Sequence, residues 1–492
     1  MKSNRRKFLK LSGLAGVGLA TATACTSEKK VVSNLERIRE QAVRQRKQVF
    51  NMSGYAAPKL ETVRVGFIGL GSRGPGHVSN VSLLDGVEIK ALCDLIPEEI
   101  EKTKRRIEGS GFTPQAYTGT EEAWKKMCDR EDIDLVYIAT PWSMHVEMAV
   151  YAMEHGKHVC IEVPAANTLE ECWQLAEASE KTKKHCMMLE NCCYDFFELL
   201  TLNMARQGYF GEILHGEGAY LHNLLGLNFD KTGYWNMWRL RENANRNGNL
   251  YPTHGLGPIC QVMGVNRGDK MDYLVATSTN DFTMNENAKK LAATDDFYKE
   301  FVDKPFRGNM NTTTIRTNKG RTIMLQHDVS SPNIYSRIHK ISGTKGSSLK
   351  YPLPGRISSS DGESWLSEEE LKSIEEKYQP VIVSRIGEMA KQVGGHGGMD
   401  FLMDWRLIDC LRNGLPLYQD VYDAALWSSI APLSEWSVAN RSNSIDVPDF
   451  TGGSWKTNQP VDILLEKGGN TEVVRSAPER KRRRPSAEGV QR

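Results

Sequence analysis

The sequence predicts an α/β protein in two parts, a doubly wound parallel sheet followed by an α+β domain with an open-faced, mainly antiparallel sheet. With 492 residues, the chain is too long for one ordinary domain. Strand-like and helix-like segments alternate through residues 61–195, which is typical of a parallel sheet covered by helices. Through residues 196–450, strand-like runs follow one another with hairpin signals, which favours antiparallel pairing.

The hydrophobic pattern predicts each element of the first part. Short apolar runs predict strands at 64–70, 87–94, 134–141, 159–163 and 185–191. Between them, helices are expected at 74–84, 97–109, 121–128, 145–156 and 168–182. Ligands of open α/β sheets bind at the carboxyl ends of the strands. Polar residues at those ends are therefore the first candidates for a site.

The second part is predicted to hold strands at 212–222, 272–279, 311–318, 321–329 and 335–343. A hairpin turn is expected at TNKGR (317–321), and helices at 399–413 and 419–441 close the domain. The exposed face of such a sheet would suit a homo-oligomer. Residues 451–492 are expected to form a C-terminal extension whose basic tail, 481–492, is a disordered end rather than a binding arm.

The N-terminus is typical of an export signal. Residues 1–25 carry NRRKFLK, then a mild apolar run of small residues, then Cys25. The Arg5–Arg6 pair resembles a twin-arginine signal, and ATAC (22–25) resembles a lipoprotein cleavage box with Cys25 as the lipidated residue. A plain signal cut nearby is the alternative. The sequence thus predicts a periplasmic protein or a membrane-anchored lipoprotein, with residues 26–60 as a linker or arm.

Charge and cysteine content exclude several classes of function. The net charge is only +2, so nothing in the overall charge favours nucleic acid as a partner. Nine cysteines follow Cys25, and none forms a C-x-x-C pair. This spacing predicts neither a zinc site nor a dense disulfide framework, and no metal is expected.

A glycine-rich turn directly after the first strand indicates a dinucleotide site of the Rossmann type. GLGSRG (69–74) places Gly69, Gly71 and Gly74 in the G-x-G-x-x-G pattern at the start of a helix. The second strand ends at Asp94, where a carboxylate can accept a hydrogen bond from the ribose 2′-hydroxyl and repel a 2′-phosphate. The pattern favours NAD over NADP, and a purely structural turn is the alternative.

Further polar groups stand at the ends of the later strands. In ATPWSMH (139–145), Trp142 can stack on a cofactor, while Ser143 and His145 can form hydrogen bonds to it. The alternative for His145 is a helix N-terminal residue that faces solvent. Glu162 and Asn191 also follow strands, so both are expected in the same crevice.

The second part contains a candidate acid/base pair in YPTHGLGP (251–258). One helical turn would place Tyr251 and His254 on one face, where a phenol and an imidazole can serve as general acid and base. A structural histidine is the alternative. In GYWNMWRL (233–240), the two tryptophans are core residues or sugar platforms, and Arg239 binds a substrate oxygen or forms a surface pair. His396, in GGHGGMD (394–400), either caps the site or belongs to an ordinary loop.

Four motifs in this order, VGFIGLGSRG, Cys93-Asp94, ATPWSMH and HGKHVCIEVPAA, resemble the glucose–fructose oxidoreductase/inositol dehydrogenase superfamily over residues 60–195. Many of its members carry Glu-Lys-Pro where this chain has Glu162-Val163-Pro164. In those members the lysine acts near the nicotinamide. The valine therefore predicts that the proton chemistry of this chain depends on other groups.

Over most of residues 60–450 the motifs EVPAA, ENCCYD, GAYLH, NMWRL, YPTHGLGP and GGHGGMDFLMDWRLID resemble glycoside hydrolase family 109. The resemblance implies an α-N-acetylgalactosaminidase that holds NAD tightly and needs no metal. The cofactor residues it implies are Ser72, Arg73, Asp94, Trp142, Ser143, Met144, His145, Glu162, Val163 and Asn191, beside the glycines of the turn. The sugar residues it implies are Tyr220, Arg239, Tyr251, Pro252, Thr253, His254 and Tyr335.

The resemblance also implies a redox-neutral cycle. Oxidation at the sugar C3 makes the C2 proton acidic, a base removes it, and the glycosidic oxygen leaves C1 before water adds and the hydride returns. Tyr251 and His254 are the expected catalytic groups, either of which is the C2 base. Three alternatives stay open: a sugar dehydrogenase that releases NADH, a 3-keto-glycoside lyase, and a non-catalytic sugar-binding protein that carries the cofactor. The sugar and its linkage rest on the resemblance alone.

Overall fold

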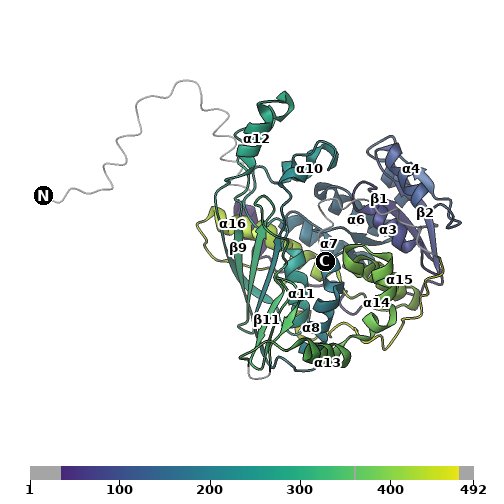
Figure 1. Cartoon of the computed structure of the whole chain (residues 1–492). Coiled ribbons are helices and arrows are strands. Elements are labelled where there is room, and N and C mark those ends of the chain that lie inside the picture. The colour runs from purple at the N-terminus through teal and green to yellow at the C-terminus, as the bar shows by residue number, and fades with distance from the viewer. Residues whose placement is uncertain (1–34, 360–361, 476–492) are drawn as a thin grey trace, which may run out of the picture.

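The chain is described by a computed structural model that covers residues 35–359 and 362–475. Two sheets, with helices between them and around them, form the molecule (Figure 1). The predicted signal, Cys25 and the basic tail at 481–492 lie outside the described residues. Within the described part, no helix is long and apolar enough to cross a membrane. All nine cysteines of that part are buried and free.

The first sheet is parallel throughout, as predicted. Its strands are β1 (Val63–Ile68), β2 (Val87–Cys93), β3 (Gln115–Tyr117), β4 (Leu135–Ile138), β5 (His158–Ile161) and β6 (Cys186–Met188). Their order is β3-β2-β1-β4-β5-β6, the doubly wound arrangement in which ligands bind where the order reverses. Strand β3 was not predicted, because three partly exposed residues give no apolar run.

The predicted helices of this part are confirmed, with somewhat shorter bounds. They are α3 (Gly74–Val81), α4 (Pro97–Arg106), α5 (Ala123–Cys128), α6 (His145–Glu154) and α7 (Leu169–Thr182). Helix α7 begins where Thr168 and Glu171 form a reciprocal capping box. Strand β5 ends at Ile161, so Glu162 and Val163 lie just past its carboxyl end.

The second sheet has eight strands: β7 (Ile213–Leu221), β8 (Met271–Ser278), β9 (Asn311–Thr317), β10 (Thr322–Asp328), β11 (Lys340–Gly343), β12 (Ser347–Leu349), β13 (Arg356–Ile357) and β14 (Ile445–Asp446). Their order is β13-β12-β11-β7-β10-β9-β8-β14, antiparallel except where β10 runs parallel to β7. The strand expected at 335–343 begins only at Lys340, because Ile338 and His339 have positive φ angles of 60° and 46°.

Helices α8 (Phe196–Arg206), α11 (Thr253–Met263) and α16 (Val421–Ala439) lie between this sheet and the first part (Figure 1). Helix α11 approaches β7 closely where two glycines meet. A Cβ atom on Gly218 would lie 2.3 Å from the carbonyl oxygen of Gly255. Because of this close approach, His254 on α11 lies next to Tyr220 on β7. The other helices are α9 (Leu225–Asn228), α10 (Trp238–Glu242), α12 (Met284–Ala292), α13 (Glu368–Tyr378), α14 (Val381–Val393) and α15 (Met399–Asn413).

Short 3₁₀ helices join several of these elements. They are η1 (Trp142–Met144), η2 (Asn191–Tyr194), η3 (Trp235–Met237), η4 (Asp296–Phe301), η5 (His396–Gly398) and η6 (Ser454–Lys456). Two of them, η1 and η2, begin at the carboxyl ends of parallel strands, at the edge where a ligand is expected.

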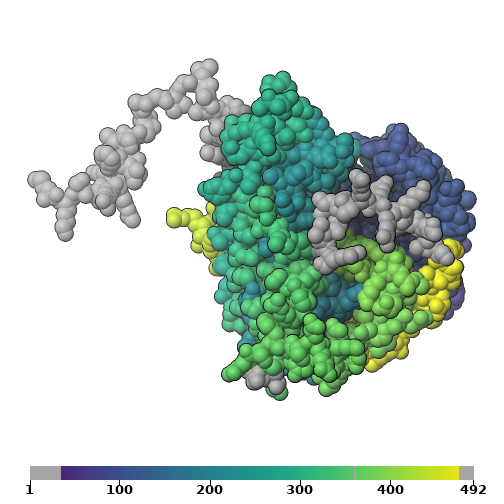
Figure 2. All heavy atoms as spheres, viewed as in Figure 1, coloured from purple at the N-terminus to yellow at the C-terminus, as the bar shows by residue number. Residues whose placement is uncertain are grey.

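The end of the chain returns to the first part. Helix α15 packs on α3, and the backbone N–H of Val474 donates to the carbonyl of Leu83. In the space-filling view the yellow C-terminal residues run along the blue N-terminal part (Figure 2). The predicted boundaries at 195 and 450 therefore do not separate independent bodies.

Residues 35–60 form an arm, not a free linker. Residues 35–42 are helical, and the buried pair Arg46–Glu180 ties the arm to α7. The Gln48 amide donates to the Tyr422 hydroxyl at 2.6 Å in α16. The arm is therefore fastened to the helices of both parts.

Candidate active site

Of the three glycines in the G-x-G-x-x-G turn, only Gly71 faces open space. A Cβ on Gly69 would lie 2.6 Å from the backbone of Ala139, and one on Gly74 would lie 1.9 Å from the carbonyl oxygen of Gly69. These two glycines are required by the fold itself. A Cβ on Gly71 would meet open space, which is the space a pyrophosphate would approach. Helix α3 has no side-chain cap, although within its first turn Pro75 carries no N–H and the N–H of Gly76 donates to the carbonyl of Arg73.

Asp94 connects the end of β2 to this turn. Its carboxylate accepts hydrogen bonds from the backbone N–H groups of Leu70, at 2.6 Å, and Ile96, at 2.8 Å. Burial raises the pKa of Asp94, although the two hydrogen bonds act to lower it. Each carboxylate oxygen accepts one bond and has a second lone pair, so the position still fits the predicted ribose contact.

The segment at 142–145 is fixed to the loop after β5. The Trp142 indole N–H donates to the carbonyl of Val163 at 3.1 Å. The His145 ring is fully buried, with its nitrogens 2.9 Å from the carbonyl oxygen of Pro164 and 2.8 Å from that of Thr140. Both ring nitrogens of His145 thus face backbone carbonyls of the loop, and its contact with the cofactor stays a prediction. The solvent-facing alternative is wrong. Ser143 and Met144 lie in η1 beside this loop.

Glu162 belongs to a network of charges that joins both parts. Its Oε1 accepts from Nε of Arg73 at 2.9 Å and lies 2.9 Å from Nε2 of His77. The other ring nitrogen of His77 lies 2.9 Å from both carboxylate oxygens of Asp404, in α15. Arg73 also contacts Asp400 at 3.2 Å, and Asp400 accepts from the Asn191 amide at 2.6 Å. Sequence reasoning found Arg73, Glu162 and Asn191, but missed the other three.

The charges in this network are fixed. Burial alone would lower the pKa of His77, but Asp404 and Glu162 outweigh it and raise the pKa from 6.5 to about 10. Burial alone would raise the pKa of Glu162, but Arg73 and His77 hold it well below its usual range. At neutral pH His77 is therefore a buried cation and Glu162 an anion.

Val163 is buried and supplies no proton, in line with the departure from Glu-Lys-Pro. The cations next to Glu162 are Arg73 and His77, which come from the start of α3 instead of from the loop after β5.

The predicted sugar residues come together on the second part. The Tyr251 ring lies 4.8 Å from that of Tyr220 and 4.8 Å from that of His254, and Tyr335 meets Tyr220 edge-on at 6.2 Å. Pro252 and Thr253, both buried, form the start of α11 beneath these rings. The aromatic cluster continues across the domain junction to Trp142, whose ring lies 5.8 Å from Tyr251.

Arg239 is a buried cation held by aromatic rings. Its guanidinium lies 4.9 Å from the centre of the Tyr251 ring and 5.5 Å from that of Trp142, and it donates to the Tyr234 hydroxyl at 3.0 Å. No carboxylate of the described residues forms an ion pair with it. The surface-pair reading is therefore wrong, and a substrate oxygen remains the predicted partner. Of the two tryptophans nearby, Trp238 packs edge-on against Trp142, while Trp235 is half-exposed.

His254 has a buried carboxylate partner that sequence reasoning missed. Its Nδ1 lies 2.7 Å from Oε1 of Glu190, which is completely buried just after β6. Burial alone would raise the pKa of Glu190, but His254 outweighs it and keeps Glu190 ionised. The contact leaves Nε2 of His254 for a substrate. Burial also raises the pKa of Tyr251 well above its ordinary value, so Tyr251 stays a hydrogen-bond donor. The signal for Glu190 was its strand-end position, equivalent to that of Glu162.

His396 lies at the mouth of the same crevice. Its Nδ1 is 2.8 Å from Asp400, and 46% of its side chain is exposed. Along with burial and other charges, His396 lowers the pKa of His222 to about 4, which places it near the sugar residues. The four glycines around it all have positive φ angles. The predicted capping position fits better than an unrelated loop.

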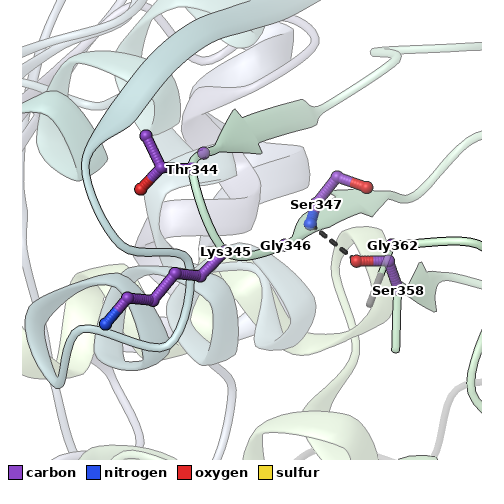
Figure 3. Close-up of a pocket in the computed structure, with 7 residues that line it drawn as sticks. Thr344, Lys345, Gly346, Ser347, Ser358 and Gly362 are labelled. Atoms are coloured by element: carbon purple, nitrogen blue, oxygen red, sulfur yellow. Dashed lines mark hydrogen bonds between the residues drawn. The ribbon is translucent and has the colours of Figure 1, made fainter. Parts of the chain in front are cut away.

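A separate pocket of about 210 Å³ lies at the turn between β11 and β12 (Figure 3). Gly343, Thr344, Lys345, Gly346, Ser347, Ser358 and Gly362 line it. None of the predicted site residues reaches it, so it is not part of the candidate active site.

Comparison with known proteins connects this geometry to a family. Residues 63–190 match the family model of the NAD-binding Rossmann fold of oxidoreductases, and residues 194–457 match the C-terminal domain of glycosyl hydrolase 109. A glycosyl hydrolase family 109 protein of Bacteroides thetaiotaomicron is 47% identical over 459 residues, which cover 90% of this chain and 96% of that relative. The chain is a member of glycoside hydrolase family 109.

Within family 109, one similar relative carries the name of an activity. An alpha-N-acetylgalactosaminidase of Bacteroides fragilis is 50% identical over 407 residues, covering 82% of this chain and 95% of the relative. Among solved structures, levoglucosan dehydrogenase in complex with NADH has a TM-score of 0.57 at 19% identity, covering 79% of this chain and 100% of that one. This likeness establishes the fold shared with NAD-dependent oxidoreductases.

Proposed function

We propose that this family 109 enzyme hydrolyses terminal α-N-acetylgalactosaminides and retains NAD between turnovers. The observation that carries the proposal is the buried Glu190–His254 pair beside the Tyr251 phenol, next to the strand ends of an NAD-binding domain. A 50% identical relative named alpha-N-acetylgalactosaminidase supports the choice of sugar.

The residues at the first sheet fit a dinucleotide. The space above Gly71 suits its phosphates, and Asp94 suits its ribose. When bound, NAD would accept a hydride from the sugar C3 and later return it, so that the C2 proton is acidic while C3 is a ketone. Glu162 and Asn191, held by fixed charges, would line the same crevice.

The chain's own residues divide the proton chemistry. Nε2 of His254 serves as a base, because the Glu190 carboxylate behind it stabilises the imidazolium that forms. Tyr251 stays protonated and donates a hydrogen bond to a sugar oxygen. Arg239, with its charge unpaired among the described carboxylates, holds a second sugar oxygen or the amide carbonyl. These groups need no pair of carboxylates flanking the glycosidic bond.

His396 is suited to the leaving-group side of the sugar. It is half-exposed at the mouth of the crevice, and its Nδ1 lies 2.8 Å from the Asp400 carboxylate. From this position it can give a proton to the glycosidic oxygen as the C1 bond breaks.

One assay separates the proposal from its alternatives. Purified enzyme is mixed with nitrophenyl N-acetyl-α-galactosaminide without added cofactor. Release of nitrophenol and free sugar, with no net NADH, supports the proposal. Accumulating NADH indicates a sugar dehydrogenase, and an unsaturated or 3-keto product indicates a lyase. If no glycoside of a panel is converted although the sugars still bind, the protein is non-catalytic.

We also propose that the enzyme is exported through the twin-arginine signal and anchored at Cys25. Fractionation tests this directly. Replacing Arg5 and Arg6 by lysine is expected to retain the protein in the cytoplasm. Replacing Cys25 by alanine is expected to release it from the membrane fraction, and unchanged distribution in either case contradicts that part of the proposal.

A further inference from the structure

Three different metal-ligating side chains converge behind the sugar site. Glu190 follows β6, Cys192 lies in η2, and His254 lies in the first turn of α11. One ligand atom from each, a carboxylate oxygen, the thiol sulfur and an imidazole nitrogen, lie within 4.8 Å of one another. Among the described residues these three form a group that could hold a metal ion.

We propose that this cluster is a site for a thiophilic divalent cation such as Zn²⁺, and that an ion bound there shuts the enzyme off. Thiolate, imidazole and carboxylate are the ligands zinc takes in proteins, at about 2.0–2.3 Å from the ion. The tetrahedral geometry requires separations of about 3.5 Å between ligand atoms. On binding, separations of up to 4.8 Å would close by about an ångström and the 2.7 Å contact between His254 and Glu190 would open, with a water in the fourth position.

The position of the thiol supports a ligand role. The backbone N–H of Cys192 donates to Oε1 of Glu190 at 3.1 Å, and its sulfur donates to Oδ1 of Asn191 at 3.5 Å. Of the three ligands, His254 is the partly exposed one, with 13% of its side chain accessible. An ion would therefore enter along the route the sugar takes.

Its neighbour Cys193 provides a matched control. The Cys193 sulfur packs against α11, where it would lie 2.9 Å from a Cβ on Gly257. Both cysteines are buried in the same short helix, but only Cys192 belongs to the cluster.

Binding has a defined proton balance and a defined consequence. The ion replaces the proton of the Cys192 thiol, which leaves to solvent, and it takes Nδ1 of His254 from Glu190. The remaining imidazole proton then resides on Nε2, the atom facing the sugar, and His254 can no longer accept a proton there. Inhibition by this route rests on the proposed function, whereas binding of the ion does not.

Binding is tested first without any activity measurement. The purified enzyme with its cofactor is titrated with Co²⁺, whose thiolate complexes absorb strongly in the near ultraviolet. We expect a saturable thiolate band at one equivalent of Co²⁺, displaced by Zn²⁺. The band is expected to vanish in Cys192→Ser and Cys192→Ala and to persist in Cys193→Ser. No band in the wild type, or the same band in all variants, overturns the proposal.

Inhibition is tested second, with each variant compared with its own metal-free rate. Zn²⁺ is expected to inhibit the wild type reversibly, with recovery on adding a chelator, while Mg²⁺ has no effect because it prefers oxygen ligands. The inhibiting concentration is expected to rise about tenfold or more in Cys192→Ser and to stay unchanged in Cys193→Ser. Zinc inhibition that is equal in both variants contradicts the site. If no glycoside is hydrolysed at all, the Co²⁺ band still decides whether the site binds an ion.

Discussion

Two glutamates at neighbouring strand ends, Glu162 after β5 and Glu190 after β6, have opposite kinds of partner. Glu162 is paired with two cations, Arg73 and a His77 that is itself enclosed by Asp404. Glu190 is paired with one histidine, His254, whose far nitrogen faces the sugar site. The first arrangement keeps charges in place, and the second leaves Nε2 of His254 free for its proposed role as base. The crevice thus has a network of ion pairs at the predicted cofactor site and a single imidazole–carboxylate pair at the predicted sugar site.

The largest effect is expected from removing the proposed base. His254→Ala should lower kcat by about 10²–10⁴-fold, because it removes the imidazole paired with Glu190. The cofactor content after purification, read by absorbance of the denatured protein, should stay at the wild-type level. Undiminished turnover would remove His254 from the mechanism, and loss of cofactor would erase the difference between the two sites.

Removing the fixed cation should instead damage the fold and cofactor retention. His77→Gln leaves Glu162 and Asp404 buried without their shared cation, which should lower the free energy of unfolding by about 3–5 kcal/mol. Denaturant titration and cofactor content measure this. His155→Gln, at an exposed histidine just after the end of α6, is the control and should change neither. A His77 variant of normal stability that retains its cofactor would contradict the fixed role.

Replacing the partner of the proposed base should have an intermediate effect. Glu190→Gln keeps the shape but removes the charge behind His254, and kcat should fall by about a hundredfold with little change in KM. Steady-state kinetics on the nitrophenyl substrate measures both constants. Glu212→Gln, at an exposed position just before β7, is the control. A selective rise in KM would indicate a binding role for Glu190 instead.

The smallest effect is a slope in the pH dependence of stability. The pKa of His77 is raised from 6.5 to about 10 on folding, so its stabilising contribution is complete below about pH 6.5 and is lost as the pH rises toward 10. The free energy of unfolding should therefore decline over this window in the wild type. The decline should be smaller in His77→Gln, and equal slopes would place the titration elsewhere.

Local pattern was sufficient to nominate the strand-end residues and Tyr251, whereas Tyr220 and Tyr335 of the predicted sugar cluster were implied by the family resemblance alone. Glu162, Asn191 and Tyr251 stand next to apolar runs or in short motifs, where the spacing alone indicates a site. His145 has the same kind of position, yet its ring serves the loop, because a strand-end residue can face the backbone as readily as the crevice.

The missed residues share a physical reason. Asp404 lies 327 positions after its partner His77, on a helix whose residues are nearly all buried, so no periodicity marks the carboxylate as a ligand. That α15 returns to α3 depends on tertiary packing, which one sequence does not display. Glu190 was visible as a strand-end carboxylate, but its partner on α11 was not.

The packing of α15 on α3 also determines where proteins of this family can be divided into separate domains. The junction between the two family models, at residues 190–194, looks like a natural place to cut or recombine genes. A fragment ending there would keep Arg73 and His77 but lose Asp400 and Asp404, and with them most of the compensating negative charge. A chimera that exchanges the second domain must therefore carry a compatible α15. The first domain is not expected to be stable when it is transferred without that helix.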